Sequence, residues 1–254
     1  MNEYPQGCAV VFGASGGIGR AIAQSMAQWG ARQVLVYRGN QDVVDKVCED
    51  IRASGGHAEA AQCDITDAAA VNDVIHQAHE THGRVHSVVD ATGVLHSFNR
   101  VPEIDPVAFR HVIETDIFGL FNIARAAIPL MRESNGGAIV TLGTNATHRT
   151  LYGNGLSAIS KSANAMMIRQ IALEEGRKGI RANMVGAGII DAGMTHAFRG
   201  GGSGQNTYDA FIASIPLRRA GQPKELADLV AFLTSSRGAY VTGQIIHVDG
   251  GLTA

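Results

Sequence analysis

Short apolar segments alternate with longer amphipathic segments along almost the whole chain. Short apolar runs are typical of buried strands, and apolar positions that recur every three or four residues indicate helices. The strands are expected at Cys8–Phe12, Val34–Tyr37, His57–Cys63, Ser87–Asp90, Ala138–Leu142, Ile180–Val185 and Gln244–Val248. The helices are expected at Ile18–Trp29, Gln41–Ala53, Ala68–His82, Pro106–Met131, Gly155–Arg177 and Glu225–Leu233. This alternation predicts an α/β fold in which helices cover both faces of a parallel sheet.

The organisation of the chain indicates one domain. No linker, internal repeat or shift in composition divides its 254 residues, so residues 1–254 are expected to fold together. One low-complexity stretch, Gly200-Gly201-Gly202-Ser203-Gly204, lies between the sixth strand and the next expected helix. We expect this stretch to be a flexible loop within a substrate lid near residues 191–215.

Composition and charge exclude several classes of protein. Hydrophobic residues make up 45% and charged residues 17% of the chain, a globular balance that excludes a disordered chain. The net charge is −2 and no basic run is present, which argues against nucleic acid as a partner. Cys8, Cys48 and Cys63 form no C-x-x-C pair and suit a reducing compartment. Neither a signal-peptide pattern nor an apolar stretch of about 18 residues is present, so we expect a cytoplasmic protein without membrane contact.

The strongest chemical signal follows the first expected strand. Glycines recur in Gly13-Ala14-Ser15-Gly16-Gly17-Ile18-Gly19 with the spacing G-x-x-x-G-x-G, directly before the first helix. Glycines permit a tight turn and a close approach to a ligand, and a helix N-terminus offers free N–H groups to a pyrophosphate. A plain tight turn is the alternative, but the position after the first strand of an alternating α/β chain favours a dinucleotide site. Its expected members are Gly13, Ser15, Gly16, Gly17, Ile18 and Gly19.

The end of the second expected strand bears on the choice of dinucleotide. An acidic residue at this position binds the ribose 2′-hydroxyl of NAD, whereas an arginine accommodates the 2′-phosphate of NADP. The strand ends at Tyr37-Arg38, and the next acid, Asp42, lies further along the chain. The sequence therefore favours NADP(H) over NAD(H), with a solvated surface arginine as the alternative for Arg38.

Several further segments, taken with the glycine turn, resemble one family over nearly the whole chain. They are Asp64-Ile65, Asp90-Ala91-Thr92-Gly93, Ser160-Lys161-Ser162-Ala163, Arg181-Ala182-Asn183-Met184-Val185, Tyr240-Val241-Thr242-Gly243 and Asp249-Gly250-Gly251. The family that they resemble is the short-chain dehydrogenase/reductase family. The combination is far more specific than any one of the motifs.

The resemblance implies a single-domain, doubly wound Rossmann-type fold of about seven parallel strands with helices on both faces. It implies a nicotinamide dinucleotide that contacts the glycine turn and a set of residues from later loops. That set is Asp64, Ile65, Ala91, Thr92, Gly93, Lys161, Gly188 and Ile190. It also implies a homotetramer, or a dimer, in which the long helices around residues 106–131 and 155–177 lie at one interface.

The positions that carry the family's catalytic residues are mostly changed in this chain. Members that act on a carbonyl use an Asn, a Ser, a Tyr and a Lys. The tyrosine exchanges a proton with the substrate oxygen, and the lysine lowers the pKa of that tyrosine. Here the lysine is Lys161, and the positions of Tyr, Ser and Asn hold Ser157, Thr144 and Asp116. An aliphatic hydroxyl is far harder to ionise than a phenol, so Ser157 can donate a hydrogen bond but is a poor acid.

Two residues are candidates to replace the phenol. Tyr152 could reach the site from the loop before Ser157, or it could be a packing or surface tyrosine. Asp116 could hold a proton only where burial penalises its charged form, whereas a nearby Lys161 would favour that form. Its alternative role is structural hydrogen bonding within a helix. Peroxisomal-type 2,4-dienoyl-CoA reductases, a branch of the family that lacks the tyrosine, rely on an Asp and a Lys that correspond to Asp116 and Lys161.

Three functions follow from these observations. The first is an NADP(H)-dependent oxidoreductase that transfers hydride to a carbonyl or conjugated substrate, such as an enoyl or ketoacyl thioester. The second is an enzyme similar to the 2,4-dienoyl-CoA reductases. The third is an inactive relative that binds a nucleotide or a partner subunit. No metal site is expected, because the histidines on or beside one helix share no single face. These histidines are His76, His79, His82 and His86.

Overall fold

Seven parallel strands form one sheet in the order β3-β2-β1-β4-β5-β6-β7. This computed structural model describes residues 3–193, 195–196 and 204–254, so residues 200–203 of the expected glycine loop lie outside the described residues. The strands are β1 (Cys8–Phe12), β2 (Arg32–Tyr37), β3 (His57–Gln62), β4 (Val85–Asp90), β5 (Gly137–Thr144), β6 (Ile180–Ala187) and β7 (Ile245–Val248). The order confirms the predicted doubly wound sheet, which starts at its centre and extends in both directions.

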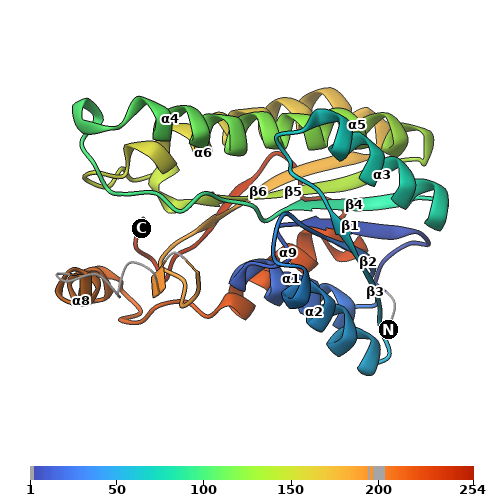
Figure 1. Cartoon of the computed structure of the whole chain (residues 1–254), viewed down its shortest axis with the longest axis horizontal. Helices are drawn as coiled ribbons and strands as arrows, with labels where there is room; N and C mark the ends of the chain where they lie inside the picture. Colours follow the sequence, from blue (N-terminus) through green and yellow to red (C-terminus); the bar gives the residue numbers. More distant parts are fainter. Residues whose placement is uncertain (1–2, 194, 197–203) are drawn as a thin grey trace.

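Helices cover both faces of the sheet (Figure 1). One layer holds α3 (Ala68–His82), α4 (Pro106–Ile113), α5 (Gly119–Glu133) and α6 (Gly155–Glu175). The other layer holds α1 (Gly17–Gln28), α2 (Gln41–Ala53) and α9 (Pro223–Thr234). Helix α8 (Gly204–Ser214) lies apart from both layers, at one end of the molecule in Figure 1. Within the described ranges every helix is too short or too polar to cross a bilayer.

Two hydrophobic cores result from this layering, one on each face of the sheet. All residues of β1 are buried, because the strand is enclosed by helices on both faces. Their side chains alternate between the two cores, as the two-residue period of a strand requires. One core includes Val11, Ile22, Met26, Leu226 and Val230. The other includes Val10, Ile75, Leu120, Ile123 and Ile168.

Local signals at the ends of α3 explain why its predicted bounds match the observed ones. The Asp67 carboxylate accepts hydrogen bonds from the N–H groups of Ala69 and Ala70 at 2.9 and 3.1 Å, and it caps the first turn. Gly83 ends the helix in the left-handed conformation with φ of 74°, which glycine adopts without steric cost. Polar capping residues are visible in a sequence, so such a helix can be delimited without a structure.

The helix expected at Pro106–Met131 is interrupted. A π-helical segment, η2 (Glu114–Phe118), separates α4 from α5. Such a segment frees backbone groups from the regular ladder, and the side chain of Asn164 on α6 donates to the Asp116 carbonyl at 2.9 Å. The prediction of one regular helix was wrong because apolar periodicity records the buried face but not a local change in hydrogen-bonding pattern.

Two other differences concern the start of β2 and the expected lid. Strand β2 begins two residues earlier than expected because Gln33, a buried polar residue, pairs its side-chain N–H with the Ala23 carbonyl at 2.9 Å. Helix α8 occupies part of the expected lid, where no helix was expected. Short three-residue 3-10 turns complete the described chain: η1 (Val101–Glu103), η3 (Asn145–Thr147), η4 (Gly176–Lys178) and η5 (Ser236–Gly238).

One buried histidine connects the fold to pH. His86, in β4, is 3% exposed, and its Nδ1 lies 2.9 Å from the Ser87 hydroxyl. Its ring packs against that of Tyr4 with centroids 5.3 Å apart. Burial, with the nearby Arg84 charge as a second cause, lowers the pKa of His86 to about 3. The folded protein therefore holds this imidazole in its neutral form.

We predict that His86 makes the protein lose stability in acid. Between pH 6.5 and pH 3 the unfolded chain binds a proton at this position and the folded chain does not, so stability falls as the pH falls. At pH 4 the loss from this one residue is about 3 kcal/mol, at 1.36 kcal/mol for each unit of pKa difference. Urea unfolding at pH 7 and pH 4 measures it. The variant His86→Phe should lose less of its free energy of unfolding over that interval, and an equal loss would contradict the prediction.

Candidate active site

The site lies at the carboxyl edge of the sheet, where the order of the strands reverses. Strand β1 pairs with β2 on one side and with β4 on the other. The loops that follow β1 and β4 therefore leave the sheet in opposite directions, which opens a crevice that binds ligands in open α/β folds. The predicted glycine turn and the predicted Ala91-Thr92-Gly93 segment follow these two strands.

The glycine turn is packed so closely that side chains cannot fit at two of its positions. Gly13 has φ of 78°, and a Cβ there would lie 2.6 Å from the Ala91 carbonyl oxygen. A Cβ on Gly19 would overlap the Gly13 carbonyl. Helix α1 starts after Gly16, with no capping hydrogen bond from a described side chain and no acidic residue in its first turn. Its N–H groups and positive dipole end are thus available to an anion, which fits the pyrophosphate of a dinucleotide.

The loop after β4 is fixed from within. Asp90, 1% exposed, accepts hydrogen bonds from the Thr141 hydroxyl at 2.9 Å and from the Thr92 hydroxyl at 2.6 Å. The Thr92 N–H donates to the same carboxylate at 3.1 Å. Asp90 therefore holds Ala91 and Thr92 against the glycine turn. A Cβ on Gly93 would meet no atom of the described residues within 4 Å.

Residues after β2 and β3 complete the side of the crevice predicted to hold the adenosine. The Asp64 carboxylate accepts from the Thr66 N–H at 3.0 Å and from its hydroxyl at 2.8 Å. These hydrogen bonds, the backbone one first, lower the pKa of Asp64 below its ordinary value. Arg38 is exposed, and its guanidinium forms no ion pair with any residue in the described ranges. Ile65 is buried, and its carbonyl accepts from Asn122 at 3.0 Å.

The segment after β6 lies against the start of α1. A Cβ on Gly17 would lie 2.9 Å from the Cβ of Ala192. Gly188 donates its N–H to the Val248 carbonyl at 3.0 Å, and a Cβ on Gly188 would lie 2.5 Å from the Asp249 Cα. Ile190 is 3% exposed. The structure therefore brings together the predicted contacts after β1, β4 and β6, while Arg38 and Asp64 lie beyond β2 and β3.

Asp116 and Lys161 form a buried ion pair. Lys161 on α6 donates from Nζ to Asp116 Oδ1 at 3.0 Å, and the side chains are 10% and 4% exposed. Such a pair is stable only if the remaining polar atoms also find partners, because both charges have lost their water. The pair joins the π-helical segment to α6.

Two residues that the sequence analysis did not single out complete this cluster. Ser160, fully buried, donates its hydroxyl to Asp116 Oδ2 at 2.6 Å. Asn164 holds the Asp116 carbonyl. Positions 160 and 161 lie four and three residues before position 164, so all three are on one side of α6. The helical spacing of Ser160 and Asn164 around Lys161 was the available signal in the sequence. The sequence does not show, however, that these side chains meet Asp116, because Asp116 lies on another helical segment.

The predicted residues Ser157 and Thr144 have contacts of their own, outside the hydrogen bonds to Asp116. Ser157 is half-buried, one helical turn before Lys161, and its carbonyl lies 3.3 Å from the Ser160 hydroxyl. Thr144 ends β5, and its hydroxyl accepts from the Ala146 N–H at 3.2 Å. Thr144 thus caps η3 while it remains half-buried.

Tyr152 does not join the buried cluster. Its side chain is 86% exposed. The predicted alternative of a surface tyrosine describes the observed position.

No group of three or more histidines, cysteines and acids in the described part of the chain is arranged to hold a metal ion.

Comparison with known proteins defines the family. Residues 13–253 match the family described as Enoyl-(Acyl carrier protein) reductase. An uncharacterized oxidoreductase of Methylorubrum extorquens is 32% identical over 252 residues, which cover 99% of this chain and 100% of that protein. A 3-oxoacyl-(acyl-carrier-protein) reductase of Staphylococcus epidermidis is 31% identical and aligns over 96% of this chain and 98% of its own length.

Solved structures agree with this. The structure of a short-chain type dehydrogenase/reductase from Mycobacterium ulcerans has a TM-score of 0.91 and 26% identity, and the alignment covers 99% of this chain and 91% of that one. The chain belongs to the short-chain dehydrogenase/reductase family, and its fold and membership define it as an oxidoreductase of the kind that uses a nicotinamide cofactor.

Proposed function

We propose that the protein is an NADP(H)-dependent reductase that acts on acyl thioesters with a carbonyl or a double bond next to the thioester. The observation that carries the proposal is the buried Asp116–Lys161 pair at 3.0 Å, one helical turn from Ser157. The family description and the Staphylococcus epidermidis relative name acyl-carrier-protein substrates, which supports an acyl thioester here.

The residues present fit a dinucleotide in the crevice. The uncapped start of α1 and the glycines that exclude side chains leave room for the pyrophosphate. Backbone and side chains after β4 and β6, including Thr92 and Ile190, would line the nicotinamide half. Asp64 would contact the adenine, and Arg38 would pair with the 2′-phosphate. The bound nicotinamide supplies hydride to the substrate.

The side chains then have to manage the proton and the developing negative charge. In a conjugated thioester, hydride addition to the distal carbon places negative charge on the thioester oxygen. Hydroxyl groups of Ser157 and Thr144 would donate hydrogen bonds to that oxygen, which requires no ionisable phenol. Asp116 would hold a water that donates a proton to carbon and takes one up from bulk solvent, with Lys161 keeping the carboxylate in place. This is the chemistry of the 2,4-dienoyl-CoA reductases, and we favour it within the proposal.

Carbonyl reduction is the second candidate, favoured by the identity with the Staphylococcus epidermidis 3-oxoacyl reductase. It would need a proton at the substrate oxygen, which the Lys161 ammonium rather than Ser157 would supply. A third possibility, an inactive relative that binds only nucleotide or a partner, would bind the cofactor without turnover on any substrate.

The catalytic proposal predicts unequal effects of three substitutions. Asp116→Asn should lower kcat for reduction of the thioester substrate about 100-fold, because positioned acid–base groups contribute a factor on the order of 10²–10⁴ to the rate. Lys161→Ala should lower it at least as much, and Ser157→Tyr should raise carbonyl relative to enoyl reduction. NADPH oxidation with crotonyl-, 2,4-hexadienoyl- and acetoacetyl-CoA measures these rates.

The exposed Lys46–Asp50 pair, with an Nζ–Oδ1 distance of 2.9 Å, provides the control variant Asp50→Asn, which should behave as wild type. Full activity of Asp116→Asn would refute the proton role of Asp116. Cofactor binding with no turnover on any of the three thioesters would support the inactive alternative.

The cofactor proposal predicts a preference for NADPH that depends on Arg38. Arg38→Asp should weaken NADPH binding about 10–100-fold, because a charge-assisted hydrogen bond contributes on the order of 1.5–3 kcal/mol, and should leave NADH binding nearly unchanged. Titration followed by nicotinamide fluorescence gives both dissociation constants. The control is Arg32→Ala, at the exposed start of β2, the strand that Arg38 directly follows. Tighter binding of NADH than NADPH by the wild type would overturn this assignment.

We also propose that the chain assembles as a homotetramer, or a dimer, through the α5–α6 face. Large apolar side chains are exposed on η2, α5 and α6 in the described structure: Phe118 is 55%, Phe121 49%, Met166 58% and Leu173 78% exposed. Exposed apolar side chains gathered on neighbouring helices are typical of interfaces.

This assembly predicts that Phe121→Asp shifts the protein towards a smaller species, since a buried unpaired carboxylate is costly. Sedimentation velocity at micromolar concentration measures the change. Leu95→Asp, at a residue that is 64% exposed elsewhere, is the control. A wild-type monomer, or identical sedimentation of wild type and Phe121→Asp, would rule out this interface.

A further inference from the structure

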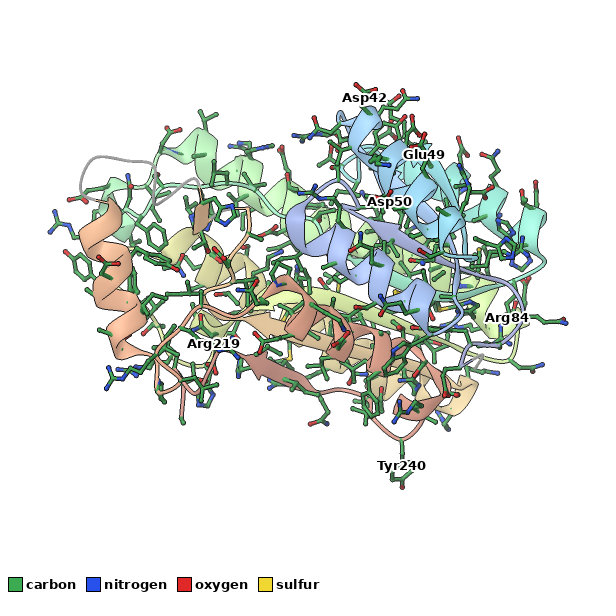
Figure 2. The ribbon with its side chains drawn as sticks, turned by 90° about the horizontal axis from the view of Figure 1, so that it is seen from below. Asp42, Glu49, Asp50, Arg84, Arg219 and Tyr240 are labelled. Carbon is green, nitrogen blue, oxygen red and sulfur yellow. The ribbon has the colours of Figure 1, made fainter. Side chains whose placement is uncertain are left out.

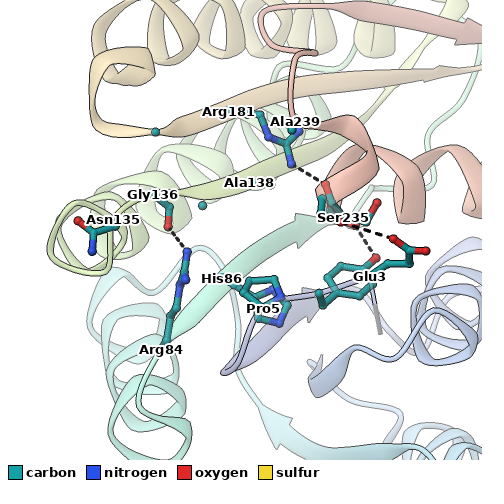
Figure 3. A pocket seen from close by; sticks show the side chains of 15 residues that line it. Glu3, Pro5, Arg84, His86, Asn135, Gly136, Ala138, Arg181, Ser235 and Ala239 are labelled. Carbon is teal, nitrogen blue, oxygen red and sulfur yellow. Dashed lines mark hydrogen bonds between the residues drawn. The ribbon is translucent and has the colours of Figure 1, made fainter. Parts of the chain in front are cut away.

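A second hollow lies at the amino ends of the strands, on the opposite edge of the sheet from the candidate active site. Its volume is about 440 Å³. It is lined by the N-terminal segment, the start of β4, the turn before β5, the start of β6 and the end of α9, and Figure 3 shows these elements around it. Figure 2 shows Arg84 at the end of the molecule away from Arg219 and α8. The two sites are therefore separate.

Two arginines line this pocket without an acidic partner. Arg84 donates from Nη2 to the Gly136 carbonyl at 3.0 Å. Arg181 donates to the Leu233 carbonyl at 2.6 Å and to the Ser235 carbonyl at 3.1 Å. These acceptors are neutral, and neither guanidinium forms an ion pair within the described ranges. A guanidinium has five N–H donors, so donors remain on both sides of the pocket.

The pocket keeps an excess of positive charge. Glu3 is its one acidic lining residue in the described part of the chain, and its carboxylate lies 3.5 Å from the Ser236 hydroxyl rather than at an arginine. The Arg84 charge lies close enough to add to burial in lowering the pKa of His86. Burial also lowers the pKa of Arg181.

Unpartnered polar atoms mark the same place. His86 is 3% exposed and lines the pocket, and its Nε2 has no hydrogen-bond partner among the described residues. The Nε of Arg84 is likewise buried and unpartnered there. Buried polar atoms in folded proteins almost always have partners, so these two atoms are available to a ligand in the pocket.

We propose that this pocket binds a small oxyanion, such as a phosphate or carboxylate group, between Arg84 and Arg181. Guanidinium forks match the paired oxygens of both groups and form charge-assisted hydrogen bonds with them. The oxyanion neutralises two half-buried cations and links the start of β4 to the start of β6. Because it binds the folded chain alone, it stabilises the fold by mass action.

Isothermal titration with sodium phosphate, sodium acetate and sodium chloride at constant ionic strength tests the proposal. We expect saturable binding of phosphate or acetate to the wild type, weakened at least tenfold in Arg84→Gln. Arg149→Gln is the matched control, because Arg149 also donates to one carbonyl, that of Leu252 at 3.0 Å. Its affinity should equal that of the wild type. Binding of phosphate alone would identify a phosphate group as the ligand, and binding of acetate alone a carboxylate.

Three results would overturn the proposal. The first is that chloride binds as tightly as the oxyanions, and the second is that none of the salts binds saturably. The third is that Arg84→Gln binds phosphate with the affinity of the wild type. The last result would place phosphate at the start of α1 instead. If Arg84→Gln does not fold, NMR of the wild type decides the matter. Phosphate should shift the His86 ring and Gly136 amide signals, and shifts confined to Gly13–Gly19 would contradict the proposal.

Discussion

A carboxylate that has been taken out of water has to be paired, and in this protein Asp116 imposes that requirement on two helices. Its oxygens are held by Lys161 and Ser160, and its backbone carbonyl is held by Asn164. Removal of one partner from such a buried pair leaves an uncompensated charge and costs about 3–5 kcal/mol. The π-helical segment that carries Asp116 therefore has its position fixed by α6. The ammonium of Lys161, in turn, is held at the candidate active site.

The remainder of the site is arranged by steric exclusion rather than by charge. Parallel strands deliver the loops after β1, β4 and β6 to one edge of the sheet. The loops approach each other so closely that Gly13 and Gly17 have no room for a side chain, and the end of β7 excludes one at Gly188. Asp90 fixes the second loop internally through Thr92 and Thr141. The crevice is thus lined by backbone, which suits a ligand recognised through its phosphates, and Asp116 and Lys161 come from the helix layer beside it.

The fold was largely predictable because its signals are local. Strand β1 is an uninterrupted apolar run, and α3 carries Asp67 at one end and Gly83 at the other. The glycine turn was predictable for the same reason. The π-helical segment was not, because it depends on Asn164, which lies 48 residues further along the chain. Ser160 was quoted as part of a motif, but its contact with Asp116 follows from packing. The same limit applies to the pocket at the amino edge, whose residues are scattered from Glu3 to Ala239.

The charges of side chains that have lost water are balanced in different ways at the two edges of the sheet. At the carboxyl edge the buried charges neutralise one another, so Asp116 and Lys161 need no ligand to be stable. Ser157, one helical turn before Lys161, adds a half-buried hydroxyl. In the reaction that we propose, an oxygen gains negative charge while the proton goes to carbon, and this hydroxyl would donate a hydrogen bond to that oxygen without ionising. At the amino edge the partners of Arg84 and Arg181 within the described ranges are neutral carbonyls, so the oxyanion that we propose would balance their charge.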